Sequence, residues 1–174
     1  MRLLLIALGY LPYTFSENLC NGKLAYAMYK KGWHVDVLSK VDEGPAYSTE
    51  WTEPWLPLKK NNITITYPVG GKLTRMWDVL RSSVKLGMYP EGGVRWACRA
   101  YELALKLCKE NHYDAVLTRS PSDIPHIIGL RLKEKLGIRW IANWNDPAAP
   151  IWPEPYTHHF SAKEQARKDQ FTQM

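Results

Sequence analysis

The sequence lacks the long apolar segment that a membrane-spanning protein needs. No apolar run reaches about 18 residues, the length from which a transmembrane helix is expected. Residues 1–8 are similar to a signal peptide, but their apolar stretch is short and no clear small-x-small cleavage site follows it. We therefore predict a buried strand over residues 3–8. We expect a cytoplasmic protein, with weak contact at the inner membrane face as a further expectation.

Cysteine is also scarce. The three cysteines, Cys20, Cys98 and Cys108, are an odd number and lack the spacing of a metal site. Each falls on the apolar side of a predicted helix, so we expect reduced thiols in a core and no disulfide framework. His158 and His159 are adjacent, and adjacent residues do not share a helix face. We expect no bound metal.

Three common motifs of α/β enzymes are missing. The chain contains no GxGxxG sequence, so nothing supports a nicotinamide or flavin dinucleotide site. It has no GxxxxGKS or GxxxxGKT sequence, which excludes the phosphate-binding loop of the P-loop enzymes. It also has no GxSxG sequence, the nucleophile turn of many hydrolases. We expect no cofactor.

The composition describes one globular domain with a positive field. The 174 residues are enough for a substantial core, and the net charge is +6. Such a field attracts phosphorylated small molecules, nucleic acid or an anionic membrane. The sequence has no basic and aromatic motif of the RNA-binding type, so we expect no nucleic-acid partner.

Hydrophobic periodicity predicts strands that alternate with helices. Strands are expected over residues 3–8, 35–38, 63–67, 115–118 and 140–144, and helices over residues 18–32, 73–88, 94–108 and 123–136. This alternation predicts an α/β fold with an open, doubly wound parallel sheet, Rossmann-like in type. We expect residues 1–155 to form this domain and residues 156–174 to begin a helix that leads to a missing C-terminal domain.

Two of the predicted helices carry apolar stripes. In the first helix, the stripe that we expect to face the core consists of Cys20, Leu24, Ala27 and Met28. In helix 73–88, the stripe consists of Leu73, Met76, Trp77, Leu80 and Val84, and it lies opposite Arg75, Arg81 and Lys85. An apolar face opposed by basic residues is typical of core helices. It is also typical of helices at a membrane surface, and we leave both interpretations open.

Candidate binding residues lie in the loops that follow the predicted strands. In parallel α/β sheets, ligands bind at the carboxyl ends of the strands, and here these loops are residues 9–18, 39–45, 118–123 and 144–148. We expect one cleft there, with these candidate residues: Ser16, Glu17, Asn18, Arg119, Ser120, His126, Asn145 and Asp146. Each also has a structural explanation, such as a helix cap for Ser16 or Asn18, a turn for Asp146 and a buried side chain for His126.

Several of these segments resemble one enzyme family. Residues 32–38 read GWHVDVL, residues 113–121 read YDAVLTRSP, and residues 137–147 read GIRWIANWNDP. Together with the opening strand, the proline-containing loop and the LAYAM sequence at residues 24–28, they resemble the N-terminal half of retaining glycosyltransferases of GT-B fold, GT4 type. Many members carry a glycine pair in the first loop, where this chain has Ser16, Glu17 and Asn18.

The resemblance implies a function in sugar transfer. It implies that this domain binds a saccharide or lipid-linked acceptor, with Asp146 as the best catalytic candidate. It also implies a nucleotide-sugar donor, held by the missing C-terminal domain, and chemistry without a metal. On this reading we expect the chain alone to be inactive. The alternative is a stand-alone Rossmann-like module that binds a small nucleotide or mediates assembly without catalysis. A third hypothesis is attachment to a membrane surface through helix 73–88.

Overall fold

The computed structural model places most of the predicted elements. It describes residues 1–11, 15–40, 72–87, 94–120, 122–145, 161–163, 165, 166 and 169. The predicted strand 63–67 and the loop before it lie outside the described residues, as does Asp146. Within 156–174, Gln165 N donates a hydrogen bond to Ser161 O, as in a helical turn. The boundary at residue 155 stays a prediction.

The core of the molecule is a parallel sheet. Its strands are β1 (Arg2–Ala7), β2 (His34–Ser39), β3 (Ala115–Arg119) and β4 (Trp140–Asn143), in the order β2-β1-β3-β4. All three pairings are parallel. β1 lies between β2 and β3, as its unbroken apolar sequence predicted, because a central strand is buried on both faces.

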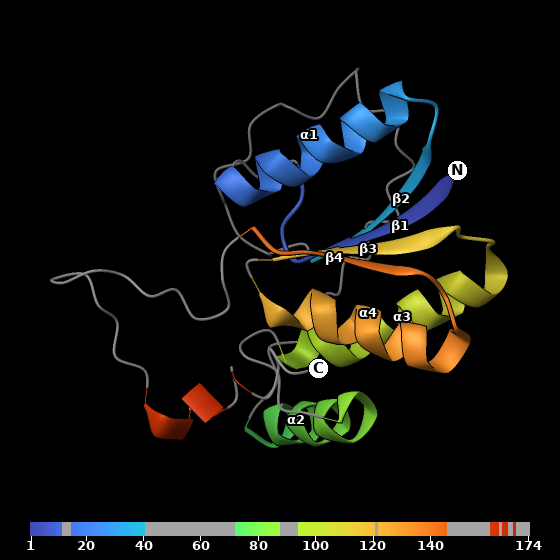
Figure 1. The fold of residues 1–174 in the computed structure, drawn as a ribbon. Helices are drawn as coiled ribbons and strands as arrows, with labels where there is room; N and C mark the ends of the chain where they lie inside the picture. Colours follow the sequence, from blue (N-terminus) through green and yellow to red (C-terminus); the bar gives the residue numbers. More distant parts are fainter. Residues whose placement is uncertain are drawn as a thin grey trace, which may run out of the picture.

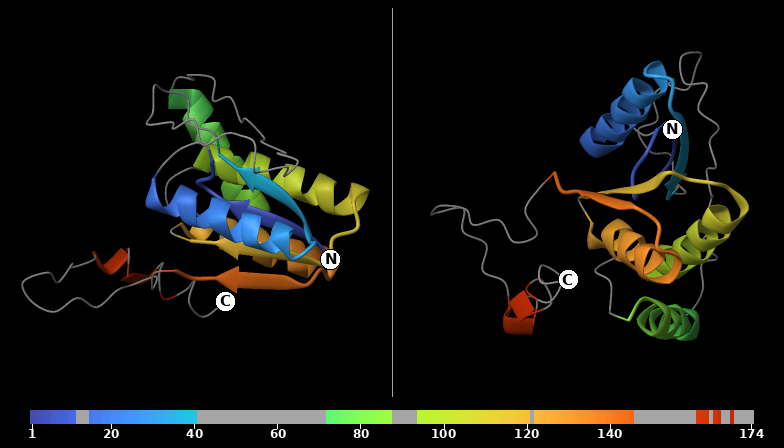
Figure 2. Two further views of the ribbon diagram at one scale, coloured as in Figure 1. Left: turned by 90° about the horizontal axis from the view of Figure 1, so that it is seen from above. Right: turned by 45° about the vertical axis from the view of Figure 1, so that its right-hand side comes forward.

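Helices cover both faces of this sheet (Figure 1). α1 (Ser16–Lys30) lies over one face, and α3 (Val94–Glu110) and α4 (Asp123–Leu136) lie over the other. α2 (Lys72–Leu86) packs on α3 and forms an outer layer beyond it (Figure 2). The predicted α/β fold with a doubly wound parallel sheet is confirmed, and it is Rossmann-like.

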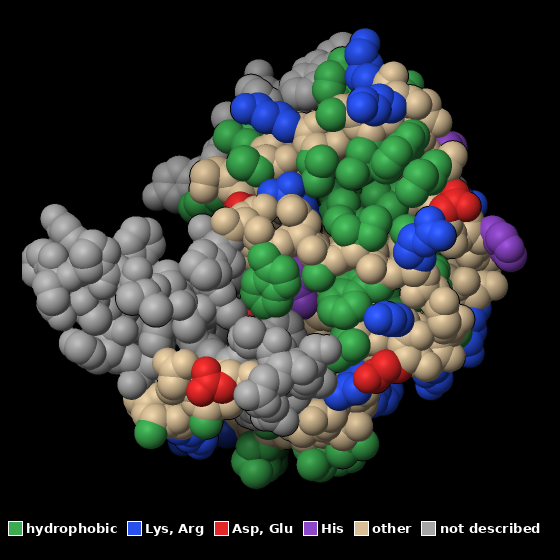
Figure 3. Space-filling model, viewed as in Figure 1, with side chains coloured by type: hydrophobic (Ala, Val, Ile, Leu, Met, Phe, Trp, Pro, Cys, Tyr) green, Lys and Arg blue, Asp and Glu red, His purple; other side chains and the backbone are tan. Residues whose placement is uncertain are grey.

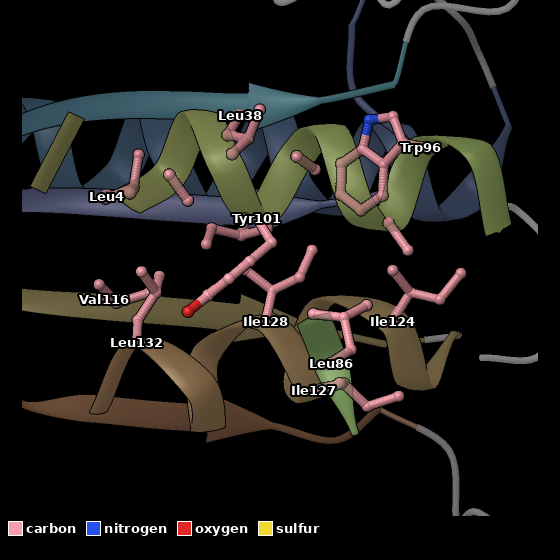
Figure 4. Close-up of a cluster of buried hydrophobic side chains, with 14 of the residues drawn as sticks. Leu4, Leu38, Leu86, Trp96, Tyr101, Val116, Ile124, Ile127, Ile128 and Leu132 are labelled. Carbon is pink, nitrogen blue, oxygen red and sulfur yellow. The ribbon is translucent and has the colours of Figure 1, made fainter. Parts of the chain in front are cut away.

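Alternation along β1 divides the core in two. Leu3 and Leu5 point towards α1, whereas Leu4 and Ile6 point towards α3 and α4. The larger cluster lies between the sheet and α3 and α4, and Figure 4 shows its side chains meeting from all three elements. Trp96, which is fully buried, fills one end of it.

The boundaries of α4 follow from its own sequence. Ser122 Oγ accepts a hydrogen bond from Ile124 N at 3.2 Å, so Ser122 caps the helix as expected. Gly137 ends it with a φ of 66°, in the left-handed region that favours glycine. The apolar side chains expected in the core are buried: Ile124, Ile127, Ile128 and Leu132.

The stripe predicted for α1 is confirmed only in part: Leu24 and Met28 are half-buried and pack on the core, whereas Cys20 and Ala27 are exposed. The buried residues of this helix are Asn18, Asn21, Gly22 and Ala25, whereas Cys20 is exposed. Gly22 faces the core at close range. A Cβ there would lie 2.5 Å from a Leu11 methyl, so a larger side chain would clash. Asn21 Nδ2 donates to Gly9 O at 2.8 Å. The helix thus turns its small and amide side chains inwards, because they fit the loop that follows β1 and satisfy its carbonyls.

The cysteines divide accordingly. Cys98 is buried, Cys108 is half-buried, and all three thiols are free. Burial raises the pKa of the Cys108 thiol to about 11. The expectation of a core thiol is wrong for Cys20, because the face of α1 that carries it is exposed to solvent.

Of the two interpretations left open for the stripe of α2, the core face is wrong, because the stripe is exposed. The inward side of this helix carries Asp78, Ser82 and Leu86, spaced four residues apart. The five residues of the stripe point away from α3 and are among the exposed large hydrophobic side chains of the molecule. None of the helices in the described parts of the chain is both long enough and apolar enough to cross a bilayer.

A charged cluster joins three segments at the amino edge of the sheet. Asp36, in β2, is 1% exposed and accepts hydrogen bonds from Arg2 Nη2 at 2.9 Å and Tyr113 Oη at 2.7 Å. Arg2 Nη2 also donates to Asn111 Oδ1 at 2.9 Å. Asp114 Oδ2 accepts from Arg2 N at 2.6 Å. These bonds fasten β1 to β2 and to the turn before β3.

Candidate functional site

Polar side chains from three elements meet at the carboxyl edge of the sheet. Glu17 comes from the first turn of α1, Arg119 ends β3, and Asn145 follows β4. Arg119 Nη2 lies 3.3 Å from Glu17 Oε1, and Asn145 Nδ2 donates to the same oxygen. Ser120 Oγ accepts from Asn145 N at 2.7 Å. One carboxylate therefore connects two of the loops that the sequence predicted to converge.

Arg119 is the most enclosed charge in this cluster. Its side chain is 10% exposed, and Glu17 is the carboxylate that faces it. Its Nε is buried, and within the described ranges no group accepts a hydrogen bond from it. A guanidinium has five donors in a fixed fork, so part of this fork is left for an oxygen that the described residues do not supply.

Asn18 and Ser16 were predicted to bind a ligand, but the structure does not bring either of them into the cluster of Glu17, Arg119 and Asn145. Asn18 Nδ2 donates to Tyr10 O at 3.1 Å and packs on Gly9, where a Cβ would lie 2.0 Å from Asn18 Oδ1. Asn18 therefore holds the loop after β1. Ser16 is exposed, and the residue that precedes the helix, Phe15, makes no side-chain cap. The expectation of a cap by Ser16 or Asn18 is wrong because the helix begins at Ser16 itself.

His126 lies inside the fold, behind the polar cluster. It is fully buried on α4, and its Nδ1 lies 2.8 Å from Thr118 Oγ1. Trp140 Nε1 donates to the same hydroxyl at 2.8 Å, and Thr118 Oγ1 donates to Ile141 O at 3.5 Å. Burial lowers the pKa of His126 to about 4, and the ring is neutral at pH 7. These contacts join α4, β3 and β4.

The sequence analysis missed Trp144 as a site residue. Its indole stacks on His126, with ring centroids 4.1 Å apart and planes 20° from parallel. The residue is 39% exposed and directly precedes Asn145. The sequence predicts it only as the last residue of strand 140–144. The stacking on a buried ring was not readable from sequence, because the two residues are separated by the whole second half of α4 and by β4.

The remaining candidate residues are not connected by this geometry. Asp146, the best catalytic candidate, lies outside the described residues. Within the described ranges, no group of three or more histidine, cysteine, aspartate and glutamate side chains lies together as a metal site would require. The role of Ser16, Glu17, Asn18, Arg119, Ser120, His126, Asn145 and Asp146 in acceptor binding stays a prediction.

Comparison with known proteins gives few similarities. No protein-family model matches the sequence, and no curated protein sequence matches it. The C-terminal domain of a hydrogenase from Pyrococcus furiosus is similar in structure, with 16% identity and a TM-score of 0.49, over 82% of this chain and 89% of that one. A sucrose-phosphate synthase from Thermosynechococcus elongatus is 12% identical with a TM-score of 0.49, over 98% of this chain and 40% of that one.

The chain thus spans 40% of the length of the synthase and most of the hydrogenase domain. At these identities neither similarity assigns a function to it.

Proposed function

We propose that this chain is the acceptor-binding domain of a glycosyltransferase and that the Glu17, Arg119 and Asn145 cluster binds sugar hydroxyls. The observation that carries the proposal is the shared carboxylate of Glu17, which holds a buried guanidinium and an exposed amide at the carboxyl edge of a parallel sheet. Ligands of such sheets bind at this edge. The sequence resemblance to GT-B glycosyltransferases supplies the class of ligand.

The chemistry of the cluster suits a neutral polyhydroxyl compound. A sugar hydroxyl both donates and accepts hydrogen bonds, and the cluster offers a carboxylate acceptor beside guanidinium and amide donors. Glu17 partly neutralises Arg119, so the cluster holds less free positive charge than a phosphate site needs. The exposed ring of Trp144 adds an apolar surface next to Asn145, against which a sugar ring can pack.

The cluster would orient the acceptor and supply little acid–base chemistry. Holding a reactive hydroxyl in place contributes to catalysis through proximity. We propose Asp146 as the residue that contacts the reacting hydroxyl, and a nucleotide sugar as the donor, bound by residues of a further domain. Retention of configuration and independence from metals are expectations from the resemblance.

Nuclear magnetic resonance titration of the full chain tests the proposal. We expect neutral monosaccharides and disaccharides to shift the backbone amides of residues 17, 119, 120 and 145. Glu17→Gln keeps the shape of the side chain but removes the charge-assisted hydrogen bonds, so saccharide affinity should fall about tenfold.

The matched control is Glu134→Gln on the surface of α4, where Glu134 pairs with Arg131 at 2.5 Å. This variant should bind saccharides like the parent chain. Saccharide-induced shifts away from the carboxyl edge, or equal losses in both variants, would contradict the proposal.

A further inference from the structure

The outward face of α2 is an exposed apolar surface. Its five side chains and their exposed fractions are Leu73 81%, Met76 67%, Trp77 60%, Leu80 53% and Val84 75%. Their spacing of three or four residues places them along one side of a helix. Figure 3 shows hydrophobic side chains along the lower edge of the molecule, where Figure 1 places α2. Contiguous apolar surface of this kind marks an interaction site.

This apolar face points away from the sheet. α3 and α4 lie between α2 and the strands, so α2 is the outermost layer on this side (Figure 2). The inward line of Asp78, Ser82 and Leu86 contacts the rest of the fold, and the apolar line is on the opposite side. None of the residues that the structure describes covers the apolar line, which leaves its whole length to an extended, flat partner.

The charge on α2 limits the kind of partner. The helix contains four basic residues and one acid, and the acid, Asp78, is buried. Arg81 and Lys85 both contact Glu102 of α3, which leaves this group of three with one net positive charge. Lys72 is exposed at the start of the helix. The partner must therefore offer apolar surface and negative charge together.

We propose that α2 binds the surface of an anionic lipid bilayer and lies in its plane. The five apolar side chains would enter the boundary between headgroups and acyl chains, with Lys72, Arg81 and Lys85 at the level of the lipid phosphates. Trp77 has a ring suited to this boundary, because its indole combines an apolar body with one N–H donor. This proposal does not depend on the sugar chemistry proposed above.

A second copy of the chain fits this face less well. Two copies of α2 packed against each other would bury the apolar residues but would bring together two sets of basic residues without new acids. Like charges at such a contact oppose association, whereas an anionic bilayer attracts them.

Flotation of the full chain with lipid vesicles tests the proposal. We expect the chain to float with phosphatidylcholine vesicles that contain about 30% phosphatidylglycerol, to float poorly with pure phosphatidylcholine, and to dissociate as salt is raised. The double variant Leu73→Ser/Trp77→Ser should lose binding by at least about tenfold, because two large apolar side chains no longer leave water.

The matched control is Tyr29→Ser, which removes an aromatic side chain that is 40% exposed on α1. It should bind anionic vesicles like the parent chain. All substituted residues are exposed, so circular dichroism should show the parent fold in both variants.

Three results would overturn the proposal. The first is no flotation with anionic vesicles at low salt. The second is equal flotation of the parent chain and the double variant. The third is a dimer of the parent chain in sedimentation that the double variant abolishes, since a second copy would then cover the face. None of these results bears on saccharide binding at the carboxyl edge.

Discussion

Burial determines what the ionisable side chains of this molecule do. Asp36 is inside the fold, and it is tolerated there because Arg2 and Tyr113 donate hydrogen bonds to it. Tyr113 responds with a raised pKa, caused first by its burial and then by its bond to Asp36. His126 is buried against Thr118 and Trp144, and burial keeps its ring neutral instead.

The neutral state of His126 predicts a pH dependence of stability. Burial lowers its pKa from 6.5 to about 4, whereas in the unfolded chain the imidazole titrates near 6.5. Between these values the unfolded state binds a proton that the folded state does not. The free energy of unfolding should therefore be fully retained above pH 6.5 and fall by about 3 kcal/mol towards pH 4. Urea unfolding at several pH values measures it.

The variant His126→Asn isolates this contribution. It keeps an amide near Thr118 but removes the titrating ring, so the loss of stability between pH 6.5 and 5 should become smaller. His112→Gln, at an exposed position, should behave like the parent chain. An unchanged pH dependence in His126→Asn would contradict the assignment.

At the scale of elements, α4 approaches the sheet closely at Gly129. A Cβ at this position would lie 2.2 Å from Trp140 Nε1 and 2.7 Å from Thr118 Cγ2. These are the two side chains whose hydrogen bond joins β3 to β4. Glycine is required here because there is no room for a side chain. Its backbone conformation does not require glycine, since it is that of an ordinary helix.

Gly129→Ala should therefore destabilise the fold despite its better helix propensity. The propensity gain is about 1 kcal/mol. The overpacking cost of about 1–3 kcal/mol and the disturbed Trp140 bond exceed it, so we expect a net loss of about 2 kcal/mol. Chemical denaturation measures the loss, and the Trp140 indole N–H resonance should shift.

The comparison for this variant is Gly137→Ala. Nothing lies within 4 Å of a Cβ there, but φ is 66°, so the cost of about 1 kcal/mol comes from backbone strain alone. The Trp140 resonance should stay in place. A gain in stability for Gly129→Ala would show that α4 can move away from the sheet.

The sequence predicted those elements whose signals are local. Ser122, the apolar spacing and Gly137 define α4 without help from the rest of the chain, and the unbroken apolar run at 3–8 defines a central strand. The inner face of α1 was predicted only in part, and the orientation of α2 was left open, because hydrophobic periodicity alone does not show which way a helix face points. In α1, the carbonyls of residues 9 and 10 select asparagine side chains for the inner face instead.

The site was predicted in part for the same reason. Arg119 and Asn145 follow strands, and the parallel sheet brings such residues to one edge. The sequence does not show which of the three polar residues at 16–18 points towards them, because that depends on how α1 lies over the sheet. Trp144 was missed because its partner is on another element.

At the scale of the whole molecule, the first helix presents an acid at the place where α/β proteins bind phosphate. The N-terminus of α1 lies at the carboxyl edge, and its dipole favours an anion. Glu17 in the first turn already supplies a negative charge there and is held by Arg119. A nucleotide diphosphate would have to displace this carboxylate or tolerate it.

We therefore expect this chain to bind UDP and GDP with a Kd no tighter than about 1 mM, equivalent to about 4 kcal/mol. Isothermal titration calorimetry measures the affinity directly. Micromolar binding of either nucleotide would contradict this expectation and would favour the alternative of a stand-alone nucleotide module.

The central position of β1 also affects how the chain can fold during synthesis. Arg2 and its partner Asp36 are 34 residues apart in the sequence, whereas Arg2 and its partner Asp114 are 112 residues apart. The edge of β1 that pairs with β3 therefore stays open while some 75 further residues are made, which takes about 4–15 s at about 5–20 residues per second. An open, apolar strand edge is a template for aggregation. Nascent chains that stop before β3 should therefore depend most on chaperones.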